Sequence, residues 1–438
     1  MISYYYPPLN DVGILRTVGF AKHLPSLGWN PIILTIKNPD LHFCRVDFKQ
    51  AYEAKGVYRS RSIINCSRFM GKLNGLLARI LRLVGAHLEH ELIPDLFLVP
   101  DFAFGWIPLT VIKGLQLIRR HRIDVIYATC KPNSSAIIGA LLTKFSGKPL
   151  VIDLRDPWRR GTVQKMVGNW QTAYPNAGNH WKDSVDKILE TKILKLASKV
   201  ILTTMETSQV YLRLYPFLKN RIEVIYNGYS DDFFEDKPKK RFEVFTIAYI
   251  GSFYYYLDRS EWFFKALENI NNDSQLKAKI RFLYIGGSSI VSRMIEKYNL
   301  RQIAHCTRYL PRKQAIALMQ RANLIFLKNV KPYLSTKLFE GLASGSPFLA
   351  MVDDGEAADL IRKYSPSSII VNGSNAKIIE SAIRTAYQRW RQGAMIYQVN
   401  DEFKQYFSKQ NLSKTLAKVL DSCIENNSGE KDRYECIH

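Results

Sequence analysis

Residues 335–347 read STKLFEGLASGSP and lie between two short apolar runs, residues 323–327 and 348–352. Hydroxyl side chains open the segment and a Gly-x-Pro sequence closes it, which is typical of a helix with defined ends. Apolar runs of this length on either side are typical of buried strands. The sequence therefore predicts a strand–helix–strand crossover, the connection that joins neighbouring strands of a parallel sheet.

The start of this predicted helix has the chemistry of an anion site. Ser335 or Thr336 can cap it, while its first N–H groups and the positive end of its dipole attract negative charge. Lys337 adds a full positive charge in the first turn, and Glu340 follows one turn deeper on the same face, where it can accept hydrogen bonds from sugar hydroxyls. A phosphate site beside a hydroxyl acceptor indicates a nucleotide. The alternative is an ordinary capped helix on which Lys337 and Glu340 form a surface pair.

Strand-like apolar runs alternate with helix-length segments along all 438 residues. Regular alternation of this kind predicts doubly wound parallel sheets, whose ligands bind at the carboxyl ends of the strands. The predicted strands are residues 1–6, 31–36, 124–129, 150–154, 199–204 and 222–226, and then 245–250, 280–285, 307–310, 323–327, 348–352 and 368–371.

The alternation is interrupted at residues 231–241, which have the charged, proline-containing composition of a linker. A chain of this length holds two domains with ample core for each. We therefore expect an N-terminal domain over residues 1–230 and a nucleotide-binding domain over 242–400. A C-terminal helix and tail over 401–438 can pack back on the first domain.

The composition is strongly basic. The formal net charge is +23, and residues 1–200 hold 28 Lys and Arg against 14 Asp and Glu. An excess of this size suits a polyanionic partner, such as nucleic acid, an anionic membrane surface or phosphorylated substrates. The sequence has no helix-turn-helix, zinc or RNP pattern, and its basic residues are spread over many predicted helices. We therefore expect no nucleic-acid partner.

We expect neither a transmembrane span nor a signal peptide. The most apolar window, residues 92–118, is broken by charges and prolines, and no leader precedes the first predicted strand. The six cysteines are scattered without a Cys-x-x-Cys pair, which favours a reducing cytoplasm and argues against structural zinc.

Residues 69–87 predict a basic amphipathic helix. Such a helix can lie in a membrane interface. More often it packs on its own domain, and this is the arrangement we expect here, with contact to an anionic membrane surface as the alternative. One face carries Phe69, Leu73, Leu76, Leu77, Ile80 and Val84, with Arg68, Lys72, Arg79 and Arg82 around it.

Four segments, in this order along the chain, resemble family 4 glycosyltransferases. They are residues 4–16, with a Pro-Pro start and Gly13; residues 153–158, which read DLRDPW; residues 249–252; and residues 336–347, which close on a Glu-x-x-Ala-x-Gly-x-Pro pattern. The resemblance implies an α/β fold of the GT-B type, with two Rossmann-like doubly wound domains that face a cleft.

The resemblance also implies the site residues. Asp156 and Arg155 would be catalytic, meeting the acceptor or the transferring sugar, although the two could instead form a structural pair near a turn. Glu340 would hold the ribose hydroxyls. The implied donor-binding residues are Gly13, Arg16, Gly251, Ser252, Arg259, Ser335, Thr336, Lys337 and Glu340.

The chain departs from the family pattern at three positions. Val12 replaces a glycine, Ser252 stands at an arginine position, and Pro332 falls where the first of two glutamates is expected. The missing glutamate leaves the donor sugar open. Transfer in this family needs no metal, so we expect no cofactor and no metal, and basic residues would take the place of a divalent ion.

The resemblance implies a retaining transferase that moves a sugar from a nucleotide diphosphate sugar to a lipid-linked or polysaccharide acceptor in cell-surface polysaccharide synthesis. It would work in the cytoplasm, with peripheral attachment to the inner face of the membrane. Two alternatives stay open. One is a nucleotide-sugar epimerase of the same fold, which acts on the donor alone. The other is an inactive nucleotide-binding protein, which the missing glutamate makes conceivable.

Overall fold

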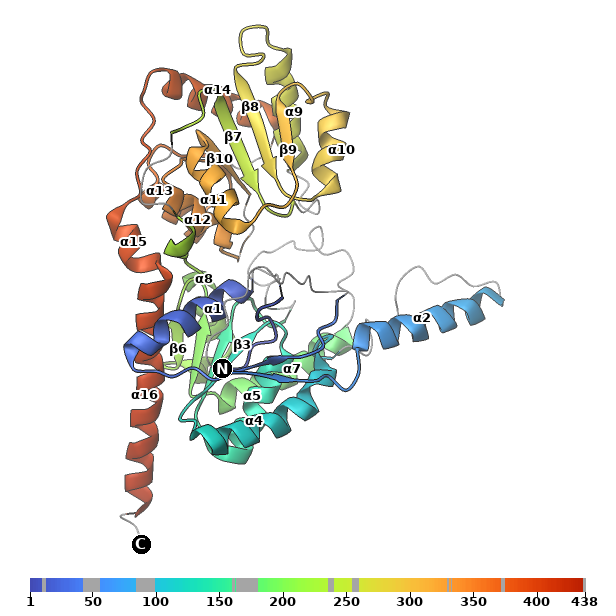
Figure 1. Cartoon of the computed structure of the whole chain (residues 1–438), viewed down its shortest axis with the longest axis vertical. Helices are drawn as coiled ribbons and strands as arrows, with labels where there is room; N and C mark the ends of the chain where they lie inside the picture. Colours follow the sequence, from blue (N-terminus) through green and yellow to red (C-terminus); the bar gives the residue numbers. More distant parts are fainter. Residues whose placement is uncertain are drawn as a thin grey trace. The chain divides into compact units, whose positions relative to one another are not determined.

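The computed structural model describes residues 1–9, 13–41, 56–83, 99–159, 162, 180–234, 240–253, 260–328, 331, 333–371 and 375–435. The chain forms two compact units, each with its own sheet and core (Figure 1). Unit 1 comprises Met1–Gly168, Asn176–Tyr226 and Leu412–His438, and most of unit 2 is Asn227–Asn411. Residues 227–230 and 401–411 therefore group with unit 2.

Unit 1 is built on parallel strands. Four of them pair in the order β3 (Ile126–Cys130), β4 (Leu150–Leu154), β5 (Lys199–Leu202) and β6 (Ile222–Val224), and β1 (Ile33–Ile36) pairs with β2 (Val57–Ser60). Ile2 joins the two groups because it bridges Leu34 on one side and Ala128 on the other. The predicted first strand, residues 1–6, is thus reduced to one bridging residue.

Helices cover both faces of the unit 1 sheet, so β3 and β4 are buried along their whole length. Alternate side chains of β3 enter two different cores. Ala128 faces one core, while Tyr127 packs with Phe20 of α1 and with Leu416 and Leu420 of the terminal helix α16. The helices are α1 (Ile14–His23), α2 (Cys66–Leu83), α4 (Ile107–His121), α5 (Ser134–Ser146), α7 (His180–Leu196), α8 (Met205–Leu214) and α16 (Lys409–Glu435), with short 3-10 turns η1 (Leu24–Leu27), η2 (Phe104–Trp106) and η3 (Pro216–Leu218).

Unit 2 has a six-stranded parallel sheet in the order β12-β11-β10-β7-β8-β9. Its strands are β7 (Phe245–Ile250), β8 (Ile280–Ile285), β9 (Ala304–Thr307), β10 (Leu324–Lys328), β11 (Phe348–Met351) and β12 (Ile369–Val371). The chain order reverses between β7 and β10, and ligands of doubly wound sheets bind at the carboxyl ends of the strands at such a switch point. The predicted fold class, α/β with doubly wound parallel sheets, is confirmed.

The helices of unit 2 alternate with these strands. They are η4 (Asp231–Phe233), α9 (Ser260–Asn272), α10 (Ser289–Lys297), α11 (Arg312–Arg321), α12 (Thr336–Ser344), α13 (Glu356–Tyr364), α14 (Ala376–Arg391) and α15 (Asp401–Phe407). One strand prediction is wrong in its position along the sequence: a strand is expected over residues 307–310, whereas β9 is Ala304–Thr307. This edge strand exposes His305 and Cys306, so it lacks the apolar run by which the other strands are found.

The predicted crossover is confirmed as β10, α12 and β11. Gly341 lets α12 approach the sheet, because a Cβ there would overlap the ring of Phe348. Gly345 ends the helix with a φ of 67°, a conformation that favours glycine. The start of α12 is thereby held beside the carboxyl ends of β7 and β10. Within the described residues, no helix is long and apolar enough to cross a bilayer.

Candidate functional site

Lys337, in the first turn of α12, lies over the end of β7. Its Nζ donates to the Tyr249 hydroxyl at 2.9 Å and to the Ser252 carbonyl at 3.0 Å, and it lies 4.4 Å from the centroid of the Tyr249 ring. Burial lowers the pKa of Lys337 to about 8, against an opposing effect from the Glu340 charge. The ammonium is therefore held by neutral groups in a partly desolvated place.

Gly251 makes room for this lysine. Its φ is 99°, and a Cβ at this position would lie 2.9 Å from Cε of Lys337 and 3.3 Å from its Nζ. The Gly251 N–H donates to the Ile285 carbonyl at 2.8 Å. This N–H is thus not available to a phosphate, and what Gly251 contributes to the site is space for Lys337. The Ser252 hydroxyl forms a hydrogen bond with the Tyr309 hydroxyl at 3.1 Å.

A second lysine, which sequence reasoning missed, lies at the same edge. Lys328 is the last residue of β10, and its Nζ lies 4.5 Å from the ring centroid of Phe253, a ring 5.1 Å from that of Tyr249. Burial, and then the charge of Lys337, lower the pKa of Lys328 to about 7. Two ammonium groups on adjacent rings repel each other, and a bound anion would relieve that repulsion.

The N-terminus of α12 is open. Ser335 has the extended conformation of an N-cap residue, but its side chain accepts no hydrogen bond from the first N–H groups, so the predicted hydroxyl cap does not form at Ser335. Within the described residues, the N–H groups of Thr336 and Lys337 donate no hydrogen bond. These N–H groups and the helix dipole can therefore act on an anion beside the two lysines.

Glu340 is buried and pairs with Arg312, not with Lys337. Its Oε1 accepts hydrogen bonds from Nε of Arg312, at 2.8 Å, and from Nη2. Residues 338–344 of α12 are buried too, so the alternative of a surface helix with a Lys337–Glu340 pair is wrong. No hydrogen bond of Oε2 is found within the described residues. Oε1 of Glu340 is thus fixed by Arg312, while Oε2 can accept a hydrogen bond from a sugar hydroxyl.

In unit 1, Asp156 follows β4 at the carboxyl edge of the sheet. It is half-buried and makes no hydrogen bond or ion pair within the described residues. Arg155 does not pair with it. Instead the Arg155 guanidinium donates to the carbonyls of Cys130 and Lys131, both at 2.7 Å, while Thr203 donates to the Arg155 carbonyl at 2.8 Å. Arg155 therefore ties three strand ends together and leaves the Asp156 carboxylate accessible.

A buried polar cluster fixes the residues that follow Asp156 in the chain. The Trp158 N–H donates to the Tyr211 hydroxyl at 3.0 Å. The fully buried Glu190 carboxylate accepts from the hydroxyls of Tyr211 and Tyr215, both at 2.7 Å, and from Nε of Arg159 at 2.9 Å. Burial raises the pKa of Glu190, an effect that these hydrogen bonds oppose. The backbone is thus fixed on both sides of Asp156, by the contacts of Arg155 before it and of Trp158 and Arg159 after it.

Arg16, a predicted donor-binding residue, is buried in an ion pair. Its Nε and Nη2 donate to the two oxygens of Asp153, at 2.7 and 2.9 Å, and Nη1 donates to the Tyr226 carbonyl at 2.7 Å. The Tyr127 hydroxyl also donates to Asp153. All three guanidinium nitrogens have protein partners, so Arg16 is placed to hold α1 on the sheet and not to bind a donor.

For two other predicted donor-binding residues, Gly13 and Arg259, the structure does not test the predicted contact. Gly13 precedes α1 with a φ of −58°, which any residue adopts, and its contact with a donor stays a prediction. Arg259 lies outside the described residues. Within those residues, no three His, Cys, Asp or Glu side chains gather in a way that could hold a metal ion.

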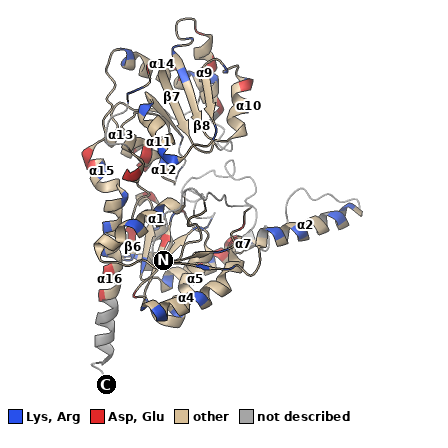
Figure 2. Ribbon diagram, viewed as in Figure 1, with Lys and Arg blue, Asp and Glu red and all other residues tan. Residues whose placement is uncertain are grey.

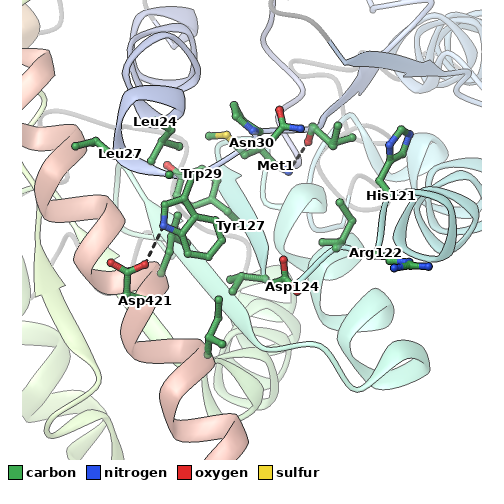
Figure 3. A pocket seen from close by; sticks show the side chains of 17 residues that line it. Met1, Leu24, Leu27, Trp29, Asn30, His121, Arg122, Asp124, Tyr127 and Asp421 are labelled. Carbon is green, nitrogen blue, oxygen red and sulfur yellow. Dashed lines mark hydrogen bonds between the residues drawn. The ribbon is translucent and has the colours of Figure 1, made fainter.

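A pocket of about 480 Å³ lies elsewhere in unit 1, between the chain after η1 and the helix α16 (Figure 3). Trp29 crosses it and donates from Nε1 to Asp421 at 3.0 Å. Asp124 and Val125, which also line it, precede β3, so the pocket is at the amino edge of the sheet. Ligands of doubly wound sheets bind at the opposite edge. We assign this pocket to the packing of α16.

Known proteins resemble the chain in sequence and in fold. Residues 16–233 match the model of Glycosyltransferase Family 4. The structure of Anabaena Alr3699/HepE in complex with UDP and glucose aligns with a TM-score of 0.62 and 15% identity, covering 96% of this chain and 98% of that one. The same protein has also been solved with UDP-glucose and with UDP.

Two further structures show the same fold. Sucrose-phosphate synthase from Thermosynechococcus elongatus aligns with a TM-score of 0.64 and 15% identity, covering 97% of this chain and 98% of that one. A putative UDP-N-acetylglucosamine 2-epimerase from Listeria monocytogenes gives 0.56 and 10%, covering 97% and 96%. None of the curated protein sequences matches significantly. The fold is that of the GT-B glycosyltransferases.

Proposed function

Because the chain belongs to Glycosyltransferase Family 4, we propose that it transfers a sugar from a UDP-sugar to a lipid-linked or polysaccharide acceptor, with retention of configuration. The likeness to HepE, which was solved with UDP and UDP-glucose, supports a uridine nucleotide as the donor. The role we propose is in the synthesis of a cell-surface polysaccharide.

The pair of lysines at the switch point of unit 2 carries this proposal. Transfer breaks the bond between the anomeric carbon and the diphosphate, and it joins that carbon to an acceptor hydroxyl oxygen. Negative charge grows on the departing diphosphate. Lys328, Lys337 and the open N–H groups of α12 offer fixed positive charge at one place, which stabilises such a transition state. We propose that they do so without a metal ion.

Glu340 and Asp156 receive the remaining roles. We propose that Oε2 of Glu340 accepts a hydrogen bond from a ribose hydroxyl while Arg312 holds Oε1 and so fixes the carboxylate. Asp156 is proposed as the carboxylate that contacts the acceptor or the transferring sugar, because it is half-exposed and its backbone is fixed. Arg155 is a positioning residue, since its guanidinium binds backbone carbonyls.

We further propose a cytoplasmic enzyme attached peripherally to the inner face of the cell membrane. The net charge of +23 suits an anionic surface. The described cysteines are unpaired, as expected in a reducing compartment. A lipid-linked acceptor would be found at the same surface.

Thermal unfolding against a panel of nucleoside diphosphates tests the donor site, because a ligand of the native state raises the midpoint. We expect UDP to raise it and Lys337→Ala to abolish the shift. Product analysis with UDP-sugar alone then tests the reaction. A change in the configuration of the donor sugar without an acceptor would indicate an epimerase, and binding without any turnover would indicate an inactive protein. Absence of a shift with every nucleotide would overturn the proposal.

A further inference from the structure

Helix α2 leaves almost its whole surface in solvent. Phe69 is 49% exposed, Leu76 56%, Ile80 51% and Leu83 86%. Of its described side chains after Cys66, only Asn74 and Leu77 are as much as half-buried. The expectation that this helix packs on its own domain is therefore wrong. Figure 1 shows α2 extending away from the sheet of unit 1.

The exposed apolar side chains form one stripe. Phe69, Leu73, Leu76, Ile80 and Leu83 follow each other at intervals of three or four residues, which places them on one face of a helix. The helix has no acidic residue, and Figure 2 shows only basic and uncharged segments along it. Its basic residues, which lie beside the stripe, are Arg68, Lys72, Arg79 and Arg82.

The start of α2 is fixed firmly in unit 1. Cys66 is 1% exposed, and a Cβ at Gly105 would lie 3.3 Å from its Sγ and 2.7 Å from the carbonyl of Ile64. The Ile63 N–H donates to the Gly105 carbonyl at 2.9 Å, and Oδ1 of Asn65 accepts from the N–H of Arg68 at 3.1 Å. A helix that is anchored in unit 1 at its first residue thus carries the apolar stripe outward.

We propose that α2 lies in the interface of an anionic lipid bilayer, with its apolar stripe in the acyl boundary and its basic residues at the headgroups. A contiguous exposed apolar surface of this kind marks an interaction site. Four positive charges and no negative one favour an anionic surface. The inference rests on the proposed function only for its cellular setting, since binding to vesicles requires no catalysis.

Co-sedimentation with lipid vesicles tests the proposal on the full chain. The vesicles contain phosphatidylcholine alone or mixed with phosphatidylglycerol. We expect binding to the mixed vesicles. The double substitution Leu76→Glu with Ile80→Glu should weaken this binding about tenfold or more, because it removes two apolar side chains from the stripe and adds two negative charges beside the basic residues. A matched control is Leu109→Glu with Ile112→Glu on α4, where side chains are 39% and 56% exposed; this variant should bind as the parent does.

Three results would overturn the proposal. The first is equal sedimentation of the parent and the α2 variant. The second is a lower unfolding midpoint of the α2 variant than of the α4 control, which would mean that the stripe packs within the protein. The third is a parent dimer that the α2 variant converts to monomer, which would assign the stripe to a second copy of the chain. Vesicle binding by a protein without transferase activity would instead leave the inference intact and count against the proposed function.

Discussion

The carboxyl edges of the two sheets use charge in opposite ways. In unit 1 three arginines at this edge are bound by the protein itself: Arg16 binds Asp153, Arg159 binds Glu190, and Arg155 binds carbonyls. In unit 2, the contacts of the Lys337 ammonium among the described residues are two neutral oxygens and a ring, and Lys328 lies on the next ring. The difference indicates that these arginines of unit 1 hold the fold, whereas Lys337 of unit 2 has only neutral partners among the described residues and is the cation that we propose binds a ligand.

The largest effect that would test this contrast is on stability. Asp153→Ala leaves the buried Arg16 guanidinium without its carboxylate, and we expect unit 1 to lose roughly 3–5 kcal/mol of unfolding free energy. Denaturant unfolding measures the loss, and UDP affinity of the folded protein should stay unchanged. Asp359→Ala is a matched control, because that carboxylate pairs with Arg362 at the surface and is 70% exposed. Normal stability with lost UDP binding would reverse the assignment of Arg16 and Asp153.

The next effect is on transfer. Lys337→Met removes a cation from the proposed diphosphate site, and we expect the turnover rate to fall by roughly 10²–10³. The unfolding midpoint without ligand should change little, because the lost contacts are to neutral groups. Lys265→Met is the control, since that ammonium pairs with Glu268 on an exposed part of α9. Equal activity of both variants would remove Lys337 from the chemistry.

A smaller effect is expected from the glycine under Lys337. Gly251→Ala places a Cβ against the lysine stem and imposes a positive φ on alanine, a strain of about 1–3 kcal/mol. UDP affinity should fall by about tenfold, because the lysine must move. Gly147→Ala is the control for the cost of a positive φ alone, because the φ of Gly147 is 68° and a Cβ there would contact no other atom. If the two variants bind UDP alike, the approach of Lys337 to Gly251 does not matter for binding.

Local patterns predicted most of the fold. The strand–helix–strand crossover over residues 323–352 is predictable because the helix ends, the glycines and the two apolar runs are contiguous in sequence. The environment of α2 was missed, because amphipathicity does not tell whether a partner face exists within the domain. The family resemblance implies a donor contact for Arg16, and its pairing with Asp153 could not be predicted because the two residues are far apart in the chain.

Lys328 was missed for the same reason. The predicted strand ends at Leu327, and the lysine after it resembles the charged residue that follows many strands. Its position becomes informative only once β10 is seen to pair with β7, which brings Lys328, Lys337 and the two rings to one edge. The signal in the sequence was a lysine directly at the carboxyl end of a buried strand, followed by a helix with a lysine in its first turn.

The last prediction tests the two lysines together through the pH dependence of UDP binding. Their pKa values of about 7 and about 8 mean that each is partly neutral near neutral pH, while a bound diphosphate favours the charged forms. UDP binding should therefore take up protons, be tightest below pH 7, and weaken roughly tenfold as pH rises from about 6 to about 8. Calorimetry in buffers of different ionisation enthalpy counts the protons. The terminal phosphate of UDP titrates in the same range, so the decisive comparison is with Lys328→Met, which should lose the lower step and keep the upper one. Parallel profiles of the two proteins would show that Lys328 does not respond to the diphosphate, and unit 2 would then bind its anion through Lys337 and the helix start alone.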